Sequence, residues 1–487
     1  MSFIINPYSF GLPDTTSDGK QAFLFIGDST SSGVSNNSVT TVDNTVYSSD
    51  GSSITELATG PQFGVTYNAL TGYKPVIIAR GVSGATIYPN GNNNNWFTSG
   101  DNYAPAAAVA NNTLSLLGIS RLKGIIINLG INDVNGVQTF VNITTGLNSL
   151  ISRLQADFPN TPIVVFQIGR NAAGMSARIA SMRNLWRQTV IDNTNVHFCG
   201  GYASLVAPGS LYDADGIHLT PTGNGEAGKM AARWFFNSSY NKWARAVISA
   251  QFDELSSARK TLINDFFATA SALAGYLELD SFYNFKTTTK NNCFVDWAFL
   301  VGPLADNGFS FTSNSRISTN GSSTYFRTGF NPTLGPFKSS QNNVFTEMRW
   351  NAAQTSGEYL CGSVPVFSGD IRGNGILNRG AAGADVFNYC LNSTKVSALH
   401  SGALVIAGGR SASNAQAVLL NGVVAASNSG ASTTPDNIEE FIGCLSINGT
   451  AGQFAASTPM RWIKGKYTTI SDFAAFTTAL NTLQDNW

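Results

Sequence analysis

The stretch AFLFIGDST, residues 22–30, joins an apolar run to a small polar turn. Residues 22–26 are apolar at every position, which is typical of a strand buried on both faces in a parallel sheet. Such a strand places Gly27, Asp28 and Ser29 at the carboxyl edge of the sheet. Ligands of open α/β sheets bind at this edge, so the stretch predicts a fold class and the place of a functional site.

Similar apolar runs recur through the first half of the chain, and patterns with helical spacing separate them. Helical patterns cover residues 143–158, 176–190 and 223–236. Strands that alternate with helices indicate βαβ units, so we expect a three-layer α/β/α domain with a parallel sheet over residues 20–240. The further predicted strands are residues 75–79, 124–129, 162–167 and 196–199.

The pattern changes after about residue 240. Apolar residues between 252 and 277 recur at helical spacing and predict one long amphipathic helix within a helical connector, residues 241–284. Short apolar runs between Gly, Asn and Ser then predict an all-β jelly-roll sandwich over residues 285–487, closed by a short helix. Within it, Asn421-Gly422 predicts a type I′ hairpin turn. Residues 1–19 form a separate N-terminal segment.

Charge and composition exclude several classes of protein. Lys+Arg and Asp+Glu both number 29, so the formal net charge is zero and a nucleic-acid partner is not expected. A basic membrane-surface protein is equally unexpected, and no apolar run approaches the ~18 residues of a membrane span. The opening MSFIINPYSFGLPD lacks the basic and apolar regions of a signal peptide.

The cysteines and histidines do not form a metal-binding pattern. The five cysteines are widely spaced without a CxxC, which favours small buried residues over a disulfide framework or zinc ribbon. The three histidines, His197, His218 and His400, form no HxH or HExxH motif, which argues against a zinc hydrolase. We therefore expect neither a metal nor a cofactor, and we interpret His197 and His400 as structural.

Three polar motifs follow predicted strands or precede a predicted helix. Ser29 could be a nucleophile, although a serine there is more often the N-cap of a helix. Asn132 could donate its amide to an oxyanion, although alone it is more simply a turn residue. In the DGIH sequence at residues 215–218, His218 could accept a serine proton and Asp215 could orient its ring, with Asp213 as the alternative carboxylate.

The joint pattern is more specific than its parts, because Gly84 adds a fourth element after the second strand. A glycine leaves its backbone N–H uncovered, as an oxyanion donor requires. The four blocks GDS (27–29), SGA (83–85), GIND (130–133) and DGIH (215–218) together resemble the SGNH, or GDSL-type, hydrolases.

This resemblance implies a three-layer α/β/α fold and metal-free ester hydrolysis. It assigns Ser29 as the nucleophile, His218 as the base and Asp215 as the residue that orients it. The backbone N–H groups of Ser29 and Gly84 and the side chain of Asn132 would form the oxyanion hole. The resemblance covers about residues 20–240, under half of the chain.

Two further resemblances concern the substrate and the setting. GPQFGVTYNAL at residues 60–70 and the segment PVIIARGVSGATI look like the sialate O-acetylesterase-like carbohydrate esterases, although those usually carry a GQS-type serine block and a Glu-containing third block. The second half is similar to concanavalin A-like (laminin-G-like) modules of tailed phages, and SFIINPYSFG at the start resembles phage virion proteins. Together they imply a phage tail fibre or tailspike, located in the virion, that deacetylates host surface glycan.

The expected partners are therefore an acetylated polysaccharide and other virion tail proteins. Phage fibres are often homotrimers, but no heptad repeat in this chain predicts one. Two alternatives stay open: a GDSL lipase or thioesterase, and a non-catalytic glycan-binding adhesin. An intact set of Ser29, Asn132 and His218 counts against an adhesin. The polar loop NGNNNNW at residues 90–96 suits sugars better than an acyl groove, although solvated turns explain such a loop equally well.

Overall fold

The computed structural model describes two compact units of the chain. The first unit comprises Met1–Ala172, Leu185–Gly201 and Ser210–Ser238, and the second comprises Ala173–Asn184, Tyr202–Gly209 and Ser239–Trp487. The described residues are 15–16, 19–28, 46–47, 59–91, 94–97, 102–169, 177–201, 205, 211–273, 279–298, 306–333, 340, 342–350, 358–364, 373–379, 385–392, 396–399, 405–435, 437–454, 456, 458–466 and 470–487.

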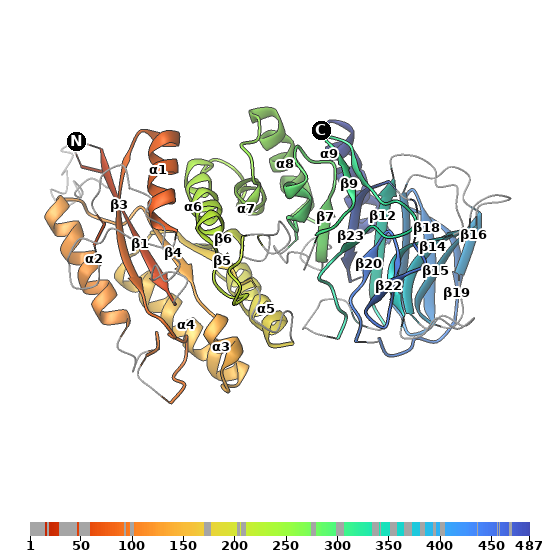
Figure 1. Ribbon diagram of the computed structural model, residues 1–487, viewed down its shortest axis with the longest axis horizontal. Coiled ribbons are helices and arrows are strands. Elements are labelled where there is room, and N and C mark those ends of the chain that lie inside the picture. Colours follow the sequence, from red (N-terminus) through yellow and green to blue (C-terminus); the bar gives the residue numbers. More distant parts are fainter. Residues whose placement is uncertain are drawn as a thin grey trace, which may run out of the picture. The chain divides into compact units, whose positions relative to one another are not determined.

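The first unit is built on a parallel six-stranded sheet in the order β2-β3-β1-β4-β5-β6 (Figure 1). Each of the five strands expected from the sequence is a strand of this sheet, which confirms the α/β prediction. The elements are β1 (Lys20–Gly27), β2 (Val46–Tyr47), α1 (Gly60–Thr71), β3 (Lys74–Gly81), α2 (Tyr103–Leu117), β4 (Gly124–Asn128), α3 (Ile131–Asn135), α4 (Phe140–Asp157), β5 (Ile163–Gln167), α5 (Ala177–Asp192), β6 (Val196–Gly201) and α6 (Pro221–Phe236). The part of α5 up to Asn184 belongs to the second unit.

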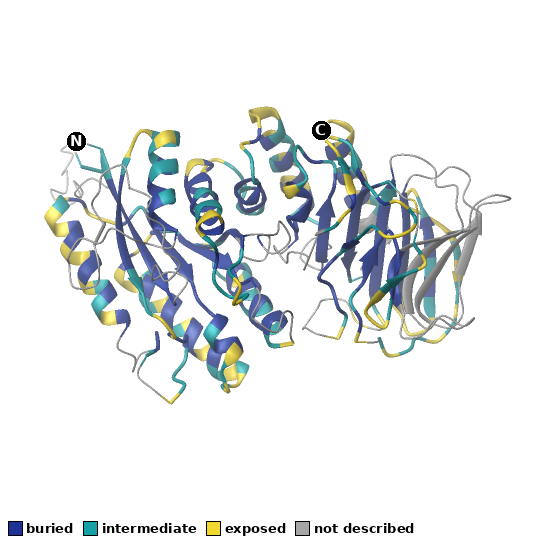
Figure 2. Ribbon diagram, in the orientation of Figure 1, coloured by how far each residue is buried: buried dark blue, intermediate teal, exposed yellow. Residues whose placement is uncertain are grey.

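Helices cover both faces of this sheet, which explains why its strands are apolar throughout. All five residues of β4 and of β5 are buried, as are seven of the eight in β1 (Figure 2). Helix α1 packs against α6, whereas α2 contacts α4 through Tyr103 and Asp157. Right-handed crossovers place these two pairs on opposite faces, because β1 to β3 and β3 to β4 run in opposite directions across the sheet.

The second unit contains two large β-sheets, antiparallel except for the pairing of β13 with β21. One has the order β16-β15-β14-β13-β20-β11-β8 with β21 and β22 attached, and the other has the order β19-β18-β17-β12-β23-β7. Its elements are α7 (Lys242–Ala250), α8 (Ser257–Ala270), β7 (Leu279–Asn284), η4 (Asn291–Phe294), β8 (Asp306–Asn307), β9 (Ser310–Thr312), β10 (Arg316–Ser318), β11 (Tyr325–Arg327), β12 (Val344–Trp350), β13 (Glu358–Val364), β14 (Gly373–Arg379), β15 (Asp385–Asn392), β16 (Val396–Leu399), β17 (Val405–Ala412), β18 (Ala415–Leu420), β19 (Val423–Asn428), β20 (Phe441–Ile442), β21 (Leu445–Ile447), β22 (Thr450–Gly452), β23 (Pro459–Gly465) and α9 (Ile470–Asp485).

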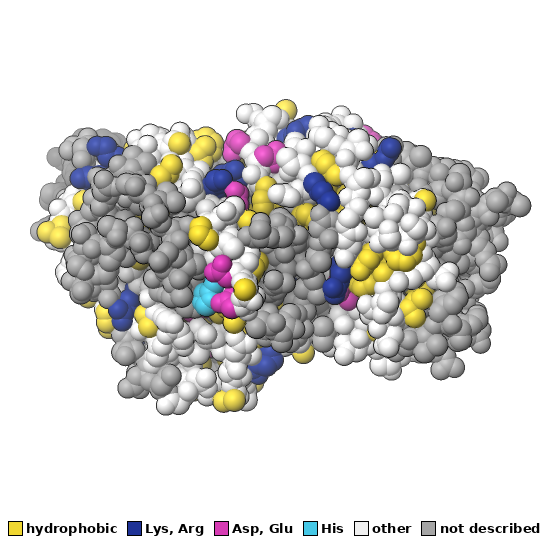
Figure 3. Space-filling model, viewed as in Figure 1, with side chains coloured by type: hydrophobic (Ala, Val, Ile, Leu, Met, Phe, Trp, Pro, Cys, Tyr) yellow, Lys and Arg dark blue, Asp and Glu magenta, His cyan; other side chains and the backbone are white. Residues whose placement is uncertain are grey.

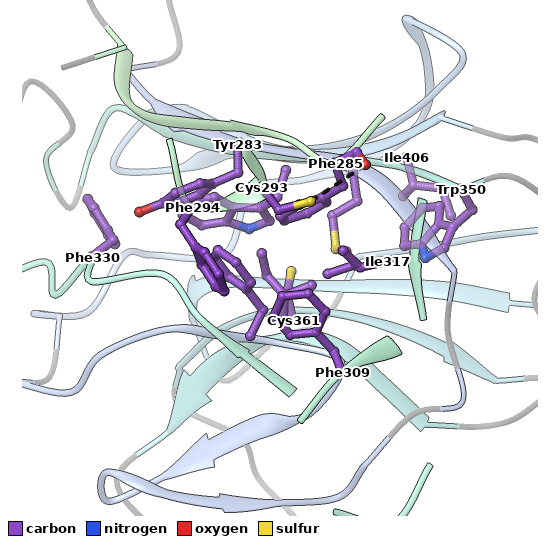
Figure 4. Close-up of a cluster of buried hydrophobic side chains, with 14 of the residues drawn as sticks. Tyr283, Phe285, Cys293, Phe294, Phe309, Ile317, Phe330, Trp350, Cys361 and Ile406 are labelled. Atoms are coloured by element: carbon purple, nitrogen blue, oxygen red, sulfur yellow. Dashed lines mark hydrogen bonds between the residues drawn. The ribbon is translucent and has the colours of Figure 1, made fainter. Parts of the chain in front are cut away.

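A single aromatic-rich core joins the inner faces of these two sheets. Tyr283 and Trp462 contribute from the six-stranded sheet, and Phe326, Cys361 and Ile442 contribute from the other. Figure 4 shows part of this cluster, including Tyr283 and Cys361. The expected β-rich second half is therefore present as two packed sheets, while its jelly-roll connectivity stays a prediction.

The predicted long connector helix is wrong, because two shorter helices and a strand occupy its place. Helix α7 ends at Ala250, and α8 begins after Ser256, whose side chain accepts a hydrogen bond from the N–H of Arg259. Between them, the N–H of Phe252 donates to Asn292 Oδ1 at 2.7 Å instead of to a helical carbonyl. The end of the predicted connector is β7, a strand paired with β23.

The structure confirms the predicted hairpin turn in the second unit. Asn421 and Gly422 have φ values of 50° and 83°, as a type I′ turn requires, and they connect β18 to β19. The closing helix is α9, and its Phe476, Leu480 and Leu483 are buried. No helix in the described ranges has the length and apolar character needed to cross a bilayer.

Candidate active site

The carboxyl ends of three neighbouring strands bring three of the sequence blocks to one edge of the first unit. In the order β3-β1-β4, Gly27 pairs with Gly81 on one side and with Asn128 on the other. The alignment continues past the strands, because the N–H of Asp28 donates to Asn128 O at 3.1 Å. Ser29 follows directly and lies outside the described residues.

The fourth block lies in a tight loop before α6. An isolated bridge joins Tyr212 to Leu219, and the N–H of Asp213 donates to His218 O at 2.9 Å. Thr220 then caps α6, with its side chain accepting a hydrogen bond from the N–H of Gly223. The cap and the bridge fix the backbone on which His218 is carried.

His218 and Asp215 contact one another within this loop. His218 Nδ1 lies 2.5 Å from Asp215 Oδ2. The other carboxylate oxygen, Oδ1, accepts from the N–H groups of Ile217 (2.8 Å) and His218 (3.0 Å). A proton on Nδ1 leaves Nε2 as the ring nitrogen that can accept one, which is the tautomer a general base needs. Figure 3 shows a histidine at the surface with acidic side chains beside it.

The same contacts set the charge of Asp215. Partial burial acts to raise its pKa, but the hydrogen bonds from the His218 ring and from the two backbone N–H groups outweigh it and lower the pKa. Asp215 therefore remains a carboxylate at pH values where an ordinary aspartate begins to take up a proton. Asp213, the alternative carboxylate, contributes its backbone N–H and C=O to the loop.

Helix α6 directs this loop to the edge where the three strands end. Phe235, near the end of α6, packs on Phe23 with ring centroids 5.1 Å apart and occupies the space above Gly124, at the beginning of β4. Sixteen helical residues span about 24 Å, close to the length of an eight-residue strand of about 26 Å. The start of α6, and with it the Asp215–His218 pair, therefore lies toward the carboxyl ends of the strands.

The loop after β3 carries Gly84 in a left-handed conformation. The N–H of Ala85 donates to Val82 O at 3.0 Å and closes a turn in which Gly84 has a φ of 74°. A positive φ at the third position is typical of a type II turn and favours glycine. Asn94 Nδ2 braces the turn by donating to Ser83 O at 2.8 Å. The turn uses the amide of Ala85 for its own hydrogen bond, not that of Gly84.

Asn132 reaches this loop from the short helix α3. Gly130, with a φ of 121°, turns the chain sharply after β4 and starts the helix. Asn132 Nδ2 then donates to Ala85 O at 3.1 Å. An amide nitrogen carries two hydrogens, so one can hold the loop while the second is directed at an oxyanion. Of the three predicted oxyanion donors, the structure describes Gly84 and Asn132. It places Asn132 in contact with Ala85, the residue that follows Gly84.

Two buried carboxylates, Asp28 and Asp133, lie beside the site, and the sequence patterns predict no role for either. Asp133 is 2% exposed, and both its oxygens lie 3.0 Å from the N–H of Ile87. Burial raises the pKa of Asp133 to about 7; the charge of Asp28 acts in the same direction, against the backbone N–H groups of Ile87 and Tyr88. Asp28 is 1% exposed and directly precedes Ser29. Asp28 belongs to the GDS motif and Asp133 to the GIND motif. The sequence does not indicate that the charge of one affects the pKa of the other.

The structure also describes a tryptophan, a histidine and four cysteines that the sequence analysis considered. Trp96 is fully buried, so the loop at residues 90–96 does not offer this ring to a sugar. His197 packs its ring 4.9 Å from that of Trp234, consistent with a structural role, whereas His400 lies outside the described residues. The four cysteines whose side chains are described are buried and unpaired: Cys199, Cys293, Cys361 and Cys444.

Residues 25–225 match the sequence model of the GDSL-like Lipase/Acylhydrolase family. This span is under half of the chain. The matched span contains all four sequence blocks and the two carboxylates beside them. No curated protein gives a significant match to the chain.

Among the solved structures that are similar to part of the chain are a plant protein and a bacterial enzyme. A protein of Arabidopsis thaliana is 15% identical, with a TM-score of 0.34, and the similarity covers 45% of this chain and 98% of that one. A carbohydrate acetylesterase from Sinorhizobium meliloti is 17% identical, with a TM-score of 0.30, covering 43% of this chain and 96% of that one. Scores this low establish neither a shared activity nor a shared substrate.

Proposed function

We propose that the protein is a serine esterase that removes O-acetyl groups from a polysaccharide, acting in a phage tail fibre or tailspike on host surface glycan. The observation that supports esterase chemistry most strongly is the contact between Asp215 and His218 within an acylhydrolase-family domain. A histidine held by a carboxylate through Nδ1 is the arrangement that activates a serine hydroxyl.

The proposed reaction begins when the Ser29 hydroxyl attacks the acetyl carbonyl and its proton passes to His218 Nε2. The backbone N–H groups of Ser29 and Gly84 and the Asn132 amide stabilise the oxyanion that forms. His218 then protonates the departing sugar hydroxyl, which leaves an acetyl-serine. Water, deprotonated by His218, attacks this ester and releases acetate, while Asp215 stabilises the imidazolium at both stages.

The proposal of a carbohydrate substrate draws support from polar residues around the Gly84 turn. Ser83 is exposed, Asn94 contacts its carbonyl, and Asn90 lies beside Gly136 at the end of α3. These side chains can hydrogen-bond sugar hydroxyls but offer little to a long acyl chain. The carbohydrate-esterase resemblance at residues 60–70 falls on α1, whose Phe63 and Tyr67 pack in the core, so it bears on packing more than on substrate contact.

We expect acetyl esters to be hydrolysed much faster than esters of eight or more carbons, because the polar surroundings of the Gly84 turn favour a small acyl group. The measurement is kcat/KM on p-nitrophenyl acetate and on longer p-nitrophenyl esters, with His218→Ala as the background. Equal or faster turnover of the long chains would instead support the lipase or thioesterase alternative.

The second unit would hold the glycan or attach the protein to the virion. It contains an open groove of about 690 Å³ over β17, β18 and β19, with uncharged polar groups in its lining from Ser411, Asn414, Gln416, Ser427 and Asn428. Such a lining suits neutral sugar hydroxyls. Acetate release from O-acetylated bacterial polysaccharide tests the proposed activity and substrate, since an adhesin would bind the polymer and release none.

Replacing Asn132 with alanine should lower kcat by roughly 10²–10³-fold with little change in KM, the effect of losing one oxyanion donor. The amide would serve the oxyanion of the transition state more than the carbonyl of the substrate. Steady-state kinetics on p-nitrophenyl acetate provides both constants. A rise in KM alone would make Asn132 a substrate-binding residue.

A further inference from the structure

We propose that Asp133 is a positioning residue, whose carboxylate holds the loop of residues 82–88 so that the Gly84 N–H faces the oxyanion. This inference rests on the proposed esterase function. Asp133 itself would touch neither substrate nor reacting atoms. It would act through the backbone of the loop.

The geometry of the carboxylate carries this proposal. Both oxygens of Asp133 lie 3.0 Å from the backbone N–H of Ile87, three residues after Gly84, and the backbone N–H groups of Tyr88 and of Asp133 itself also stabilise the carboxylate. The side chain is 2% exposed, so its hydrogen bonds are shielded from competing water. An acidic residue in the first turn of a helix commonly faces the N–H groups of its own helix, and Asp133 in addition reaches a loop 46 residues earlier in the chain.

Asp133 acts together with its neighbour Asn132 as a two-point clamp. Asn132 Nδ2 holds Ala85 O at 3.1 Å, and Asp133 holds the N–H of Ile87. The two contacts fall on either side of Thr86, so together they fix the orientation of the peptide groups and not only their position. Beyond β3, which ends at Gly81, one more hydrogen bond joins the loop to β1, from the N–H of Val82 to Gly27 O (3.1 Å), and an isolated bridge joins Thr86 to Asn95.

Packing secures the side chain of Ile87, so the carboxylate is not needed merely to keep the loop in place. Ile87 is fully buried, and a Cβ added at Gly146 of α4 would lie 3.1 Å from both its Cγ2 and its O atom. A buried carboxylate next to Asp28 is costly, because its charge has lost its hydration. We therefore explain the buried carboxylate of Asp133 by the orientation that it gives to the loop backbone.

The test is Asp133→Asn in the full-length chain. The asparagine keeps the shape but presents one acceptor oxygen and an NH₂ group that opposes the Ile87 N–H. We expect kcat per active site to fall by roughly 10²-fold, the scale of a 1 Å misplacement, with KM little changed. Active sites are counted by the end-point labelling of Ser29 with a fluorophosphonate. Asp157→Asn is the matched control, because that carboxylate accepts a hydrogen bond from Tyr103 (2.6 Å) in the same unit, and its kcat and KM should be unchanged.

The outcomes separate a positioning role from a stabilising one. If the labelled fraction and the activity fall together while kcat per labelled site is constant, Asp133 only stabilises the fold and the inference is overturned. If the wild type is active and Asp133→Asn has the same kcat, the inference is overturned and the proposed function stands. A wild type that hydrolyses no ester overturns the proposed function and the inference with it.

A second variant leaves Asp133 intact, in case Asp133→Asn does not fold. Incorporating the α-hydroxy acid analogue of isoleucine at position 87 replaces the backbone N–H with an ester oxygen. The carboxylate then loses the N–H of Ile87 but keeps that of Tyr88, and every side chain is unchanged. A similar fall in kcat supports the clamp, and an unchanged kcat refutes it.

Discussion

Replacing Ser29 with alanine should lower kcat by roughly 10⁴–10⁶-fold, the scale seen when a triad serine is removed. The reason is its place in the chain: Ser29 follows Asp28, whose backbone is fixed at the sheet edge by the hydrogen bond to Asn128. Without the hydroxyl, no covalent acetyl-enzyme can form. The remaining activity would reflect the oxyanion hole and substrate binding alone.

The measurement is kcat on p-nitrophenyl acetate, together with acetate release from an O-acetylated polysaccharide. Far-UV circular dichroism and a thermal melt serve as the controls for folding. Thr30→Ala, which removes the neighbouring hydroxyl, is the matched control variant. A Ser29→Ala protein that retains wild-type activity would remove Ser29 from the mechanism.

The second large effect concerns the base and its carboxylate. His218→Ala should reduce kcat by roughly the same factor as Ser29→Ala, because members of a triad act as a unit and their effects do not add. Asp215→Asn should cost less, since it disturbs the tautomer and the stability of the imidazolium without removing the base. Asp213→Asn should have little effect, because the structure joins His218 Nδ1 to Asp215 Oδ2.

These variants are compared by kcat and by their pH profiles. A general base accepts a proton only in its unprotonated form, so the rate should fall at low pH. Asp215 should stay ionised through that fall, because its hydrogen bonds lower its pKa. A larger loss for Asp213→Asn than for Asp215→Asn would mean that another carboxylate orients the base during turnover.

The parallel sheet could be predicted because burial on both faces leaves a direct trace in sequence. Residues 22–26 and 125–127 are uninterrupted apolar runs, and both lie in central strands of the sheet. Placing polar motifs at the ends of such strands follows from the topology of parallel sheets, so Gly84 and Asn132 could be expected to lie close together.

Other features depend on long-range contacts that a local pattern does not contain. The spacing of apolar residues over 252–277 gave no sign that a helix begins only after Ser256. Apolar residues in the loop before Ser256 continue the helical spacing, so the pattern extends beyond the helix. Trp96 ends a polar loop, yet its ring is fully buried, and the local sequence does not indicate this burial. Asp133 shows the same limit, since its partner Ile87 lies 46 residues away.

The most direct test of the central claim is the site of covalent modification by a fluorophosphonate, mapped by peptide mass spectrometry alongside esterase activity. A serine activated by His218 reacts with such reagents, whereas ordinary serines do not. The account predicts one adduct, on Ser29, with loss of activity in proportion to labelling and no adduct in His218→Ala. An adduct on a different serine, or acetate release that persists after Ser29 is fully modified, would contradict it.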